Sequence, residues 1–348
     1  MSPYILTFLL FGLGLGTTIT FASSHWLLAW MGLEINTLAM LPLMSQNKHP
    51  RAVEATTKYF LTQATAAAVL LFATTTNAWL TGEWDIQQMA HPFPVTVAIM
   101  ALALKIGIAP THAWLPEVLQ GLDLTTALIL STWQKLAPFI LMYQLQPNCP
   151  TLLMALGLLS SLIGGWGGLN QTQLRKILAY SSIAHFGWMM IIISIFPTLA
   201  LLTLLTYFIM SLSAFLTFKL NKATSINMLA NSWNKAPALT ALSPLILLSL
   251  GGLPPLTGFM PKWLIIQELT KQELNTLATL AAFTALLSLY FYLRLSYAMT
   301  LTMSPNTLTG TIPWRLQSNS LSMPLAITTV ATISLLPVLP GMTTLLKL

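Results

Sequence analysis

Four residues that can carry charge lie inside long apolar segments of this sequence: Glu34, Lys105, Lys135 and Lys262. Only 7% of the 348 residues are charged, so a charge inside such a segment needs an explanation. A charge at the centre of a bilayer costs about 2.5–3.5 kcal/mol on insertion scales, and four dry, unpaired charges would cost on the order of 10 kcal/mol. Because lysine and glutamate bind and release protons, these residues indicate a membrane protein that moves protons or ions.

The composition places the chain in a membrane and excludes several other classes. Hydrophobic residues make up 55% of the chain and charged residues only 7%. Soluble domains carry about 25% charged residues. The single cysteine, Cys149, excludes an internal disulfide framework and a clustered thiolate metal site. The net charge of +7 does not indicate nucleic-acid binding, because the basic residues are spread over separate short loops.

The apolar segments predict an all-α, polytopic membrane protein in which residues 1–348 form a single integral membrane domain. A spanning helix needs about 20 mostly apolar residues. We therefore expect about 11 spans, over residues 3–21, 25–44, 57–80, 94–119, 124–145, 150–169, 175–196, 198–219, 238–268, 275–299 and 325–346. Segments 94–119 and 238–268 are too long for one plain helix, and both contain internal prolines.

The distribution of basic residues predicts the orientation. Loops on the N-terminal side carry most of the Lys and Arg residues, whereas loops on the other side carry Lys271 and Lys347. By the positive-inside rule, the N-terminus faces the cytoplasm or the matrix of an organelle. An odd number of spans then places the C-terminus on the opposite side.

A short internal repeat accompanies the prolines. Residues 109–119 read APTHAWLPEVL and residues 254–264 read PPLTGFMPKWL, so that Pro110 aligns with Pro255 and Trp114 with Phe259. An odd number of predicted spans separates the two copies, which therefore enter the membrane from opposite faces. This is the inverted-topology plan of many transporters, and it predicts repeat units at about 25–145 and 175–299, followed by a C-terminal helix at 325–346.

Each copy also predicts a broken helix, near Pro110 and near Pro254 and Pro255. Proline removes a backbone donor and clashes with the preceding turn. In lipid, a broken helix persists only inside protein or beside a wet cavity. Proline kinks also serve packing alone, but two related breaks, each with a lysine nearby (Lys105 and Lys262), favour an ion site at half depth.

Three motifs resemble the signatures of one known family, the antiporter-like membrane subunits of respiratory complex I. They are KIGIAPTHAWLP at 105–116, AYSSIAHFGW at 179–188, and GGLPPLTGF at 251–259, followed by Lys262. The resemblance covers nearly the whole chain. It implies proton translocation coupled to electron transfer from NADH to ubiquinone, as a subunit of a translocase whose redox reaction the isolated chain does not catalyse.

The resemblance also implies a role for each charged residue. Glu34 resembles the glutamate that partners the first lysine of the family, and Lys105 resembles that lysine. Lys135 resembles the central lysine that receives the proton, and Lys262 resembles the lysine of the second broken helix. We expect Glu34 and Lys105 to form a pair, because a nearby carboxylate favours the charged form of a lysine and its withdrawal favours proton release.

Location, partners and cofactors follow from the same resemblance. It places the chain in the mitochondrial inner membrane, with the N-terminus in the matrix and the C-terminus in the intermembrane space. The expected partners are other membrane-arm and accessory subunits, together with lipid, protons and water. This chain is expected to bind no cofactor of its own, and NADH, FMN, iron–sulfur clusters and ubiquinone are expected in other subunits.

Several polar residues and two functions stay open at this stage. His112 either relays protons between Lys105 and Lys135 or bonds to the backbone, while His185, Ser181 and Ser182 are favoured as a water-holding relay in the second half. A free-standing cation/proton antiporter shares the fold and lysines, but it needs a pair of intramembrane carboxylates. A purely structural subunit has no reason to keep three lysines that leucine would replace at a gain in stability.

Overall fold

The computed structural model describes residues 2–46, 49–89, 91–145, 149–234, 237–301 and 322–346, and this part of the chain is built from helices. Two isolated β-bridges, His25 with Asp85 and Gln173 with Ser225, join loops. The chain divides into two compact units: residues 1–160 with 193–195, and residues 161–192 with 196–348. α8 (Pro150–Gly168) runs across the boundary between them.

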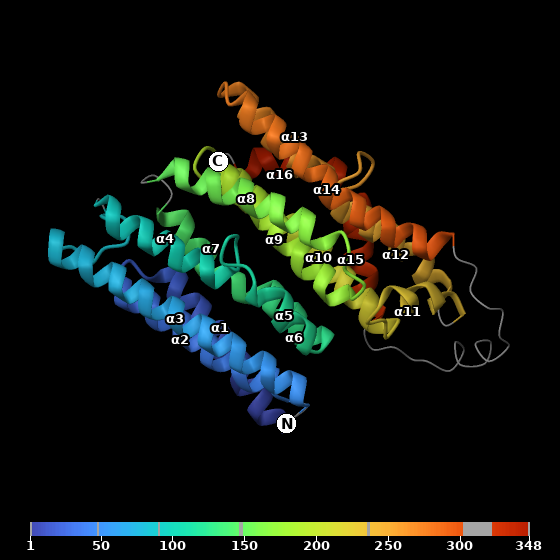
Figure 1. Cartoon of the computed structure of the whole chain (residues 1–348), viewed down its shortest axis with the longest axis horizontal. Coiled ribbons are helices and arrows are strands. Elements are labelled where there is room, and N and C mark those ends of the chain that lie inside the picture. The colour runs from blue at the N-terminus through green and yellow to red at the C-terminus, as the bar shows by residue number, and fades with distance from the viewer. Residues whose placement is uncertain are drawn as a thin grey trace. The chain divides into compact units, whose positions relative to one another are not determined.

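The first unit contains α1 (Pro3–Ala22), α2 (Trp26–Met44), α3 (Pro50–Thr81), α4 (Pro92–Ile106), α5 (Trp114–Gly121), α6 (Leu124–Ser131) and α7 (Trp133–Leu145). Figure 1 shows α1, α2 and α3 side by side. α3 also packs against α4 and α5. Proline is the first residue of α1, α3 and α4, where its missing N–H costs no hydrogen bond.

The second unit contains α9 (Leu174–Ile193), α10 (Pro197–Leu220), α11 (Ile226–Ala230), α12 (Pro237–Gly251), α13 (Phe259–Lys271), α14 (Asn275–Thr300), α15 (Ser322–Ser334) and α16 (Leu339–Leu346). α12 packs on α14, and α10 contacts α12 and α15. Gly164 of α8 lies against Ala184 of α9, and Gly165 lies against Leu287 of α14. These small residues let the helix backbones approach closely.

Hydroxyl groups inside the helices are satisfied locally. The hydroxyls of Thr20, Thr74 and Thr284 each donate to the backbone carbonyl three residues earlier in the same helix. Such bonds satisfy polar side chains where no water is at hand. A threonine within an apolar helix is therefore weak support for a polar pathway, and a pathway must be sought among groups without such partners.

Eight helices in the described part of the chain are long and apolar enough to cross a membrane, and a bent pair makes up to nine. Two shorter apolar helices, α4 and α12, begin the segments predicted to be broken. The all-α polytopic fold is thus confirmed, and a total of about 11 spans stays a prediction.

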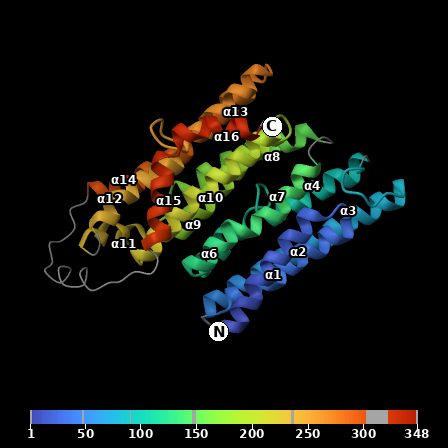
Figure 2. The ribbon, with the colours of Figure 1, turned by 180° about the vertical axis from the view of Figure 1, so that it is seen from behind.

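Two predicted segments differ from the structure. The helix expected at 57–80 begins at Pro50 instead, because His49 accepts a hydrogen bond from the Arg51 N–H and caps it. The single helix expected at 325–346 is wrong: α15 and α16 meet at a 65° bend, and Figure 2 shows them running in different directions. Pro337 and Pro340 lie at this bend, where proline removes donors that a continuous helix needs.

Candidate functional site

The first break in a helix falls where the prolines predict it. α4 ends at Ile106, and Gly107 follows with φ 82°, a left-handed conformation that favours glycine. The N–H groups of Gly107 and Ile108 both donate to the carbonyl of Ala103, each at 2.9 Å. α5 begins at Trp114, so Pro110 lies in the interruption.

The second break repeats this pattern. α12 ends at Gly251, Gly252 has φ 83°, and α13 begins at Phe259, so that Pro254 and Pro255 lie in the interruption. The N–H groups of Gly252 and Leu253 both donate to the carbonyl of Leu248, at 3.1 and 3.3 Å. Gly252 is offset from Gly107 as Pro255 is from Pro110, so sequence and backbone geometry repeat together.

Side chains satisfy the carbonyls left open at the end of α4. The indole N–H of Trp114 donates to the Leu104 carbonyl at 3.1 Å. The amide of Gln63, on α3, donates to the Lys105 carbonyl at 3.4 Å. The ring of Tyr59, also on α3, lies 5.9 Å from that of Trp114. α3 therefore holds the break in place with polar groups, which a broken helix at membrane depth requires.

We expect Gly107→Ala to lower the stability of the protein by about 1–2 kcal/mol, because a side chain is strained in the left-handed conformation. A Cβ at this position would also lie 3.3 Å from the Trp114 ring. The matched control is Gly82→Ala, since Gly82 has φ 79° but no atom within 4 Å of its added Cβ. Thermal inactivation of the solubilised protein is the measurement. A lesser loss for Gly107→Ala than for Gly82→Ala would contradict this description of the break.

Lys105 and Glu34 are electrostatic neighbours without direct contact. The Lys105 side chain lies in the last turn of α4 and is 6% exposed. Its Nζ and the Oε2 of Glu34 are buried, and neither has a hydrogen-bond partner in the described structure. Glu34 is the acidic group that acts on Lys105 electrostatically, yet the ion pairs of the described residues do not include this pair. Pairing of Glu34 with Lys105 therefore stays a prediction.

Lys135 is anchored by its neighbours on α7. Its side chain is 2% exposed. The Gln134 amide donates to the Asn36 carbonyl of α2 at 3.2 Å, and the Trp133 indole donates to the Leu13 carbonyl of α1 at 3.4 Å. These bonds fix the first turn of α7 and therefore the direction in which Lys135 leaves the helix.

Lys105 and Lys135 line one cavity. It measures about 20 Å³, which is enough for about one water molecule. The remaining wall comes from α2, α3, α6, α7 and the start of α5, through Leu33, Asn36, Thr37, Tyr59, Gln63, Trp114, Leu130, Gln134 and Pro138. Two titratable side chains from different helices thus line one small cavity.

Lys262 occupies a comparable position in the second unit. It lies in the first turn of α13 and is half-buried. Its Nζ donates to the carbonyl of Gly251 at 2.9 Å. Gly251 is the last residue of α12. A helix C-terminus carries partial negative charge and favours a cation. The end of α12 therefore supplies a partner for the Lys262 ammonium, which forms no ion pair with a carboxylate in the described part of the chain.

Some residues of the relay predicted in the second unit lie together, and the relay itself stays a prediction. Ser181, His185 and Lys262 line a common cleft with Ala184, Trp188, Ser288 and Tyr292. Ser182 is hydrogen-bonded to Tyr207, whose ring lies 5.4 Å from that of His185. The serine hydroxyls also donate to the carbonyls of Leu178 and Ala179. His185 and Ser181 thus line the same cleft as Lys262, while Ser182 lies beside Tyr207.

His112 lies apart from this arrangement. Its Nδ1 is 3.2 Å from the Pro110 carbonyl, and it is not among the residues that line the cavity between Lys105 and Lys135. A hydrogen bond to the backbone is the second of the two roles that the sequence leaves open for His112. A relay through His112 stays a prediction.

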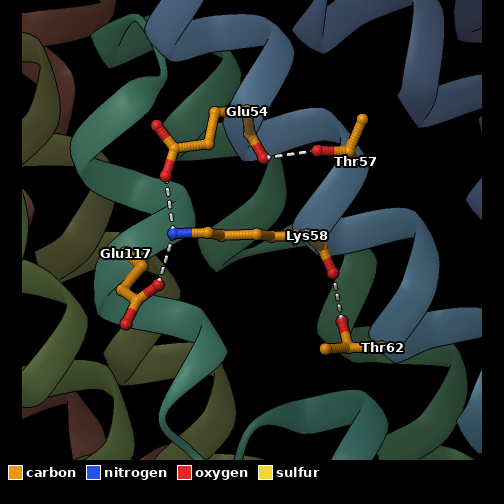
Figure 3. Close-up of polar contacts among 5 residues, drawn as sticks. All are labelled: Glu54, Thr57, Lys58, Thr62 and Glu117. Atoms are coloured by element: carbon orange, nitrogen blue, oxygen red, sulfur yellow. Dashed lines mark hydrogen bonds and ion pairs between the residues drawn. The ribbon is translucent and has the colours of Figure 1, made fainter.

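An ion-pair cluster ties α5 to α3. The ammonium of Lys58 lies 2.7 Å from both Glu54 and Glu117, as Figure 3 shows. Glu117 is in the first turn of α5, where its charge also complements the positive helix N-terminus. All three side chains are substantially exposed, so the cluster orients α5 more than it stabilises the protein.

Sequence reasoning missed the polar lining of the cavity. Asn36, Gln63 and Gln134 have no charge and belong to no recognisable motif. Their roles depend on which faces of α2, α3 and α7 meet. The described residues hold no group of three or more His, Cys, Asp or Glu side chains that could bind a metal ion.

Comparisons with known proteins agree over nearly the whole chain. Residues 23–288 match the family described as NADH:quinone oxidoreductase/Mrp antiporter, TM, and residues 289–343 match NADH dehydrogenase subunit 2 C-terminus. NADH-ubiquinone oxidoreductase chain 2 of Tetraodon nigroviridis is 73% identical, covering 100% of both chains.

Solved structures show a similar fold. A chain of respiratory complex I from Thermus thermophilus with bound aureothin is 27% identical and has a TM-score of 0.83, covering 98% of this chain and 79% of its own. A chain of the Mrp complex from Dietzia sp. DQ12-45-1b is 17% identical with a TM-score of 0.82, covering 95% of this chain and 74% of its own. The second likeness concerns the fold alone.

Proposed function

Because this chain belongs to the NADH:quinone oxidoreductase/Mrp antiporter family, we propose that it translocates protons through its buried glutamate and lysine side chains as a core membrane subunit of respiratory complex I. The observation that carries the proton route is the cavity shared by Lys105 and Lys135. Glu34 acts electrostatically on Lys105, so a change in the charge or position of Glu34 alters how strongly Lys105 holds its proton.

In the first unit, the proposed route runs from Lys105 to Lys135. When Glu34 is charged and close, it favours the ammonium form of Lys105. When that influence weakens, the proton passes through the shared cavity to Lys135. In the second unit, Lys262 binds a proton at the end of α12, and His185 and Ser181 supply polar neighbours.

We further propose that residues 1–348 form a single membrane domain with inverted repeats at about 25–145 and 175–299 and a C-terminal segment at 325–346. The shared left-handed glycines and hydrogen-bond pattern at the two breaks support this plan. The proposed location is the mitochondrial inner membrane, with the N-terminus in the matrix and the C-terminus in the intermembrane space. The excess of Lys and Arg in loops on the N-terminal side supports that orientation.

The proposed driving force comes from partner subunits of complex I. Moving a proton against about 100–200 mV costs roughly 2–5 kcal/mol before any pH difference. We propose that NADH, FMN, iron–sulfur clusters and ubiquinone act in other subunits. This chain would contact membrane-arm and accessory subunits as well as lipid, protons and water, but no nucleic acid, and would receive the coupling through those contacts.

The test is reconstitution of the chain alone and of the whole complex into liposomes that report internal pH. We expect NADH and quinone to drive acidification with the complex and to leave the pH unchanged with the chain alone. A proton ionophore that collapses the signal is the control. Acidification by the chain alone would contradict a division of labour between subunits, and a complex that oxidises NADH without moving protons would contradict translocation.

A further inference from the structure

We propose that Asn36 is a positioning residue for proton transfer between Lys105 and Lys135, holding the water through which the proton passes. The proposal rests on the proposed proton route. Asn36 lies on α2 and is 2% exposed. Asn36 is among the residues that line the cavity shared by both lysines. Both polar atoms of its amide, Nδ2 and Oδ1, are buried without a hydrogen-bond partner in the described structure.

A buried amide in this condition is unusual. Leaving a buried donor or acceptor unsatisfied costs about 1–3 kcal/mol for each group, and most buried polar side chains have a partner in protein or ordered water. The cavity has polar side chains among its apolar lining, and its volume of about 20 Å³ meets the requirement for one water molecule. An ordered water in the cavity would therefore give the Asn36 amide a partner beside both lysines.

The chemistry of an amide suits this task. Asparagine can donate from its nitrogen and accept at its oxygen, so it can orient a water molecule in either sense. It does not ionise, and it therefore holds the water without competing with Lys105 or Lys135 for the proton. A carboxylate at this position would itself accept the proton or pair with a lysine ammonium. An aliphatic side chain could not form a hydrogen bond with the water.

The fold sets Asn36 in place from two sides. The Gln134 amide donates to the Asn36 backbone carbonyl at 3.2 Å, which joins α2 to the turn of α7 that carries Lys135. On the other side, Gly16 of α1 lies against the Asn36 amide, and a Cβ at Gly16 would overlap it. Only glycine leaves room there, so α1 supports a side chain that takes part in the route between α4 and α7.

The experiment compares three variants in the assembled, reconstituted complex. Asn36→Leu keeps the branched shape and the number of side-chain heavy atoms but removes the amide, and we expect protons moved per NADH oxidised to fall to the level of Lys135→Ala. Asn36→Ser is shorter but leaves a hydroxyl and more room for water, so we expect it to retain coupled pumping. The matched control is Asn77→Leu, because Asn77 is a fully buried asparagine of α3 with an unpartnered Oδ1, away from the cavity.

The outcomes separate this inference from the function beneath it. If Lys135→Ala stops pumping while Asn36→Leu pumps normally, Asn36 has no role and the proton route stands. If Lys135→Ala also pumps normally, the route itself is wrong. If Asn36→Leu prevents assembly, a structure of the unaltered complex that resolves waters decides the matter. A water within hydrogen-bond distance of the Asn36 amide supports the proposal, and an amide bonded only to protein overturns it.

Discussion

Replacing Lys135 with alanine in the assembled complex is expected to cut proton pumping several-fold while leaving assembly close to normal. Alanine cannot bind a proton, so the route that passes from Lys105 through the shared cavity loses its acceptor. The same change removes a charge whose burial costs about 2.5–3.5 kcal/mol on insertion scales. A structural role for the lysine predicts the reverse, namely loss of complex with normal pumping by whatever assembles.

The measurement is protons moved per NADH oxidised, with the amount of assembled complex determined in the same membranes. Lys135→Met is the matched variant, because it keeps most of the side-chain volume and so avoids the cavity that alanine leaves. Both variants should pump equally poorly. A large difference between them would assign the effect to packing around Pro138 and Leu130, and equal pumping by both variants and the unaltered complex would refute the role of Lys135.

The charged residues and the breaks could be predicted from sequence because each depends on local chemistry. A lysine in an apolar segment stands out because its burial is costly. Proline near a left-handed glycine interrupts helical hydrogen bonding at both breaks, whereas Pro42, Pro138 and Pro244 lie inside helices. The C-terminal segment differs: its apolar run predicts a single helix, whereas α15 and α16 meet at a bend beside Pro337 and Pro340.

The uncharged lining could not be predicted, since it depends on how helices face one another. Gln63 and Asn36 are ordinary polar residues until α3 is seen against the end of α4 and α2 against α7. The distance between the Glu34 and Lys105 side chains could not be predicted for the same reason. Sequence placed opposite charges at similar depth, whereas the distance between them depends on side-chain packing.

The second large effect is expected at Lys262, where carrying a proton and capping a helix can be separated by substitution. The Lys262 ammonium donates to the Gly251 carbonyl at the end of α12. Arginine retains a positive donor for that carbonyl, but it does not release its proton in proteins. Lys262→Arg should therefore assemble normally and lose proton pumping. Lys262→Met removes both the donor and the proton and should lower assembly as well as pumping.

Removing the cation at a helix C-terminus costs about 0.3–1 kcal/mol of stability at an exposed site and up to ~2 kcal/mol at a partly buried one. Lys262→Met should therefore also lower the temperature at which the complex inactivates. Lys271→Met is the control, since Lys271 lies on the same helix and pairs with Glu268 on an exposed face. It should change neither pumping nor thermal inactivation appreciably. Normal pumping by Lys262→Arg would show that this lysine is a fixed charge at the break. It would confine proton transfer by buried lysines to Lys105 and Lys135.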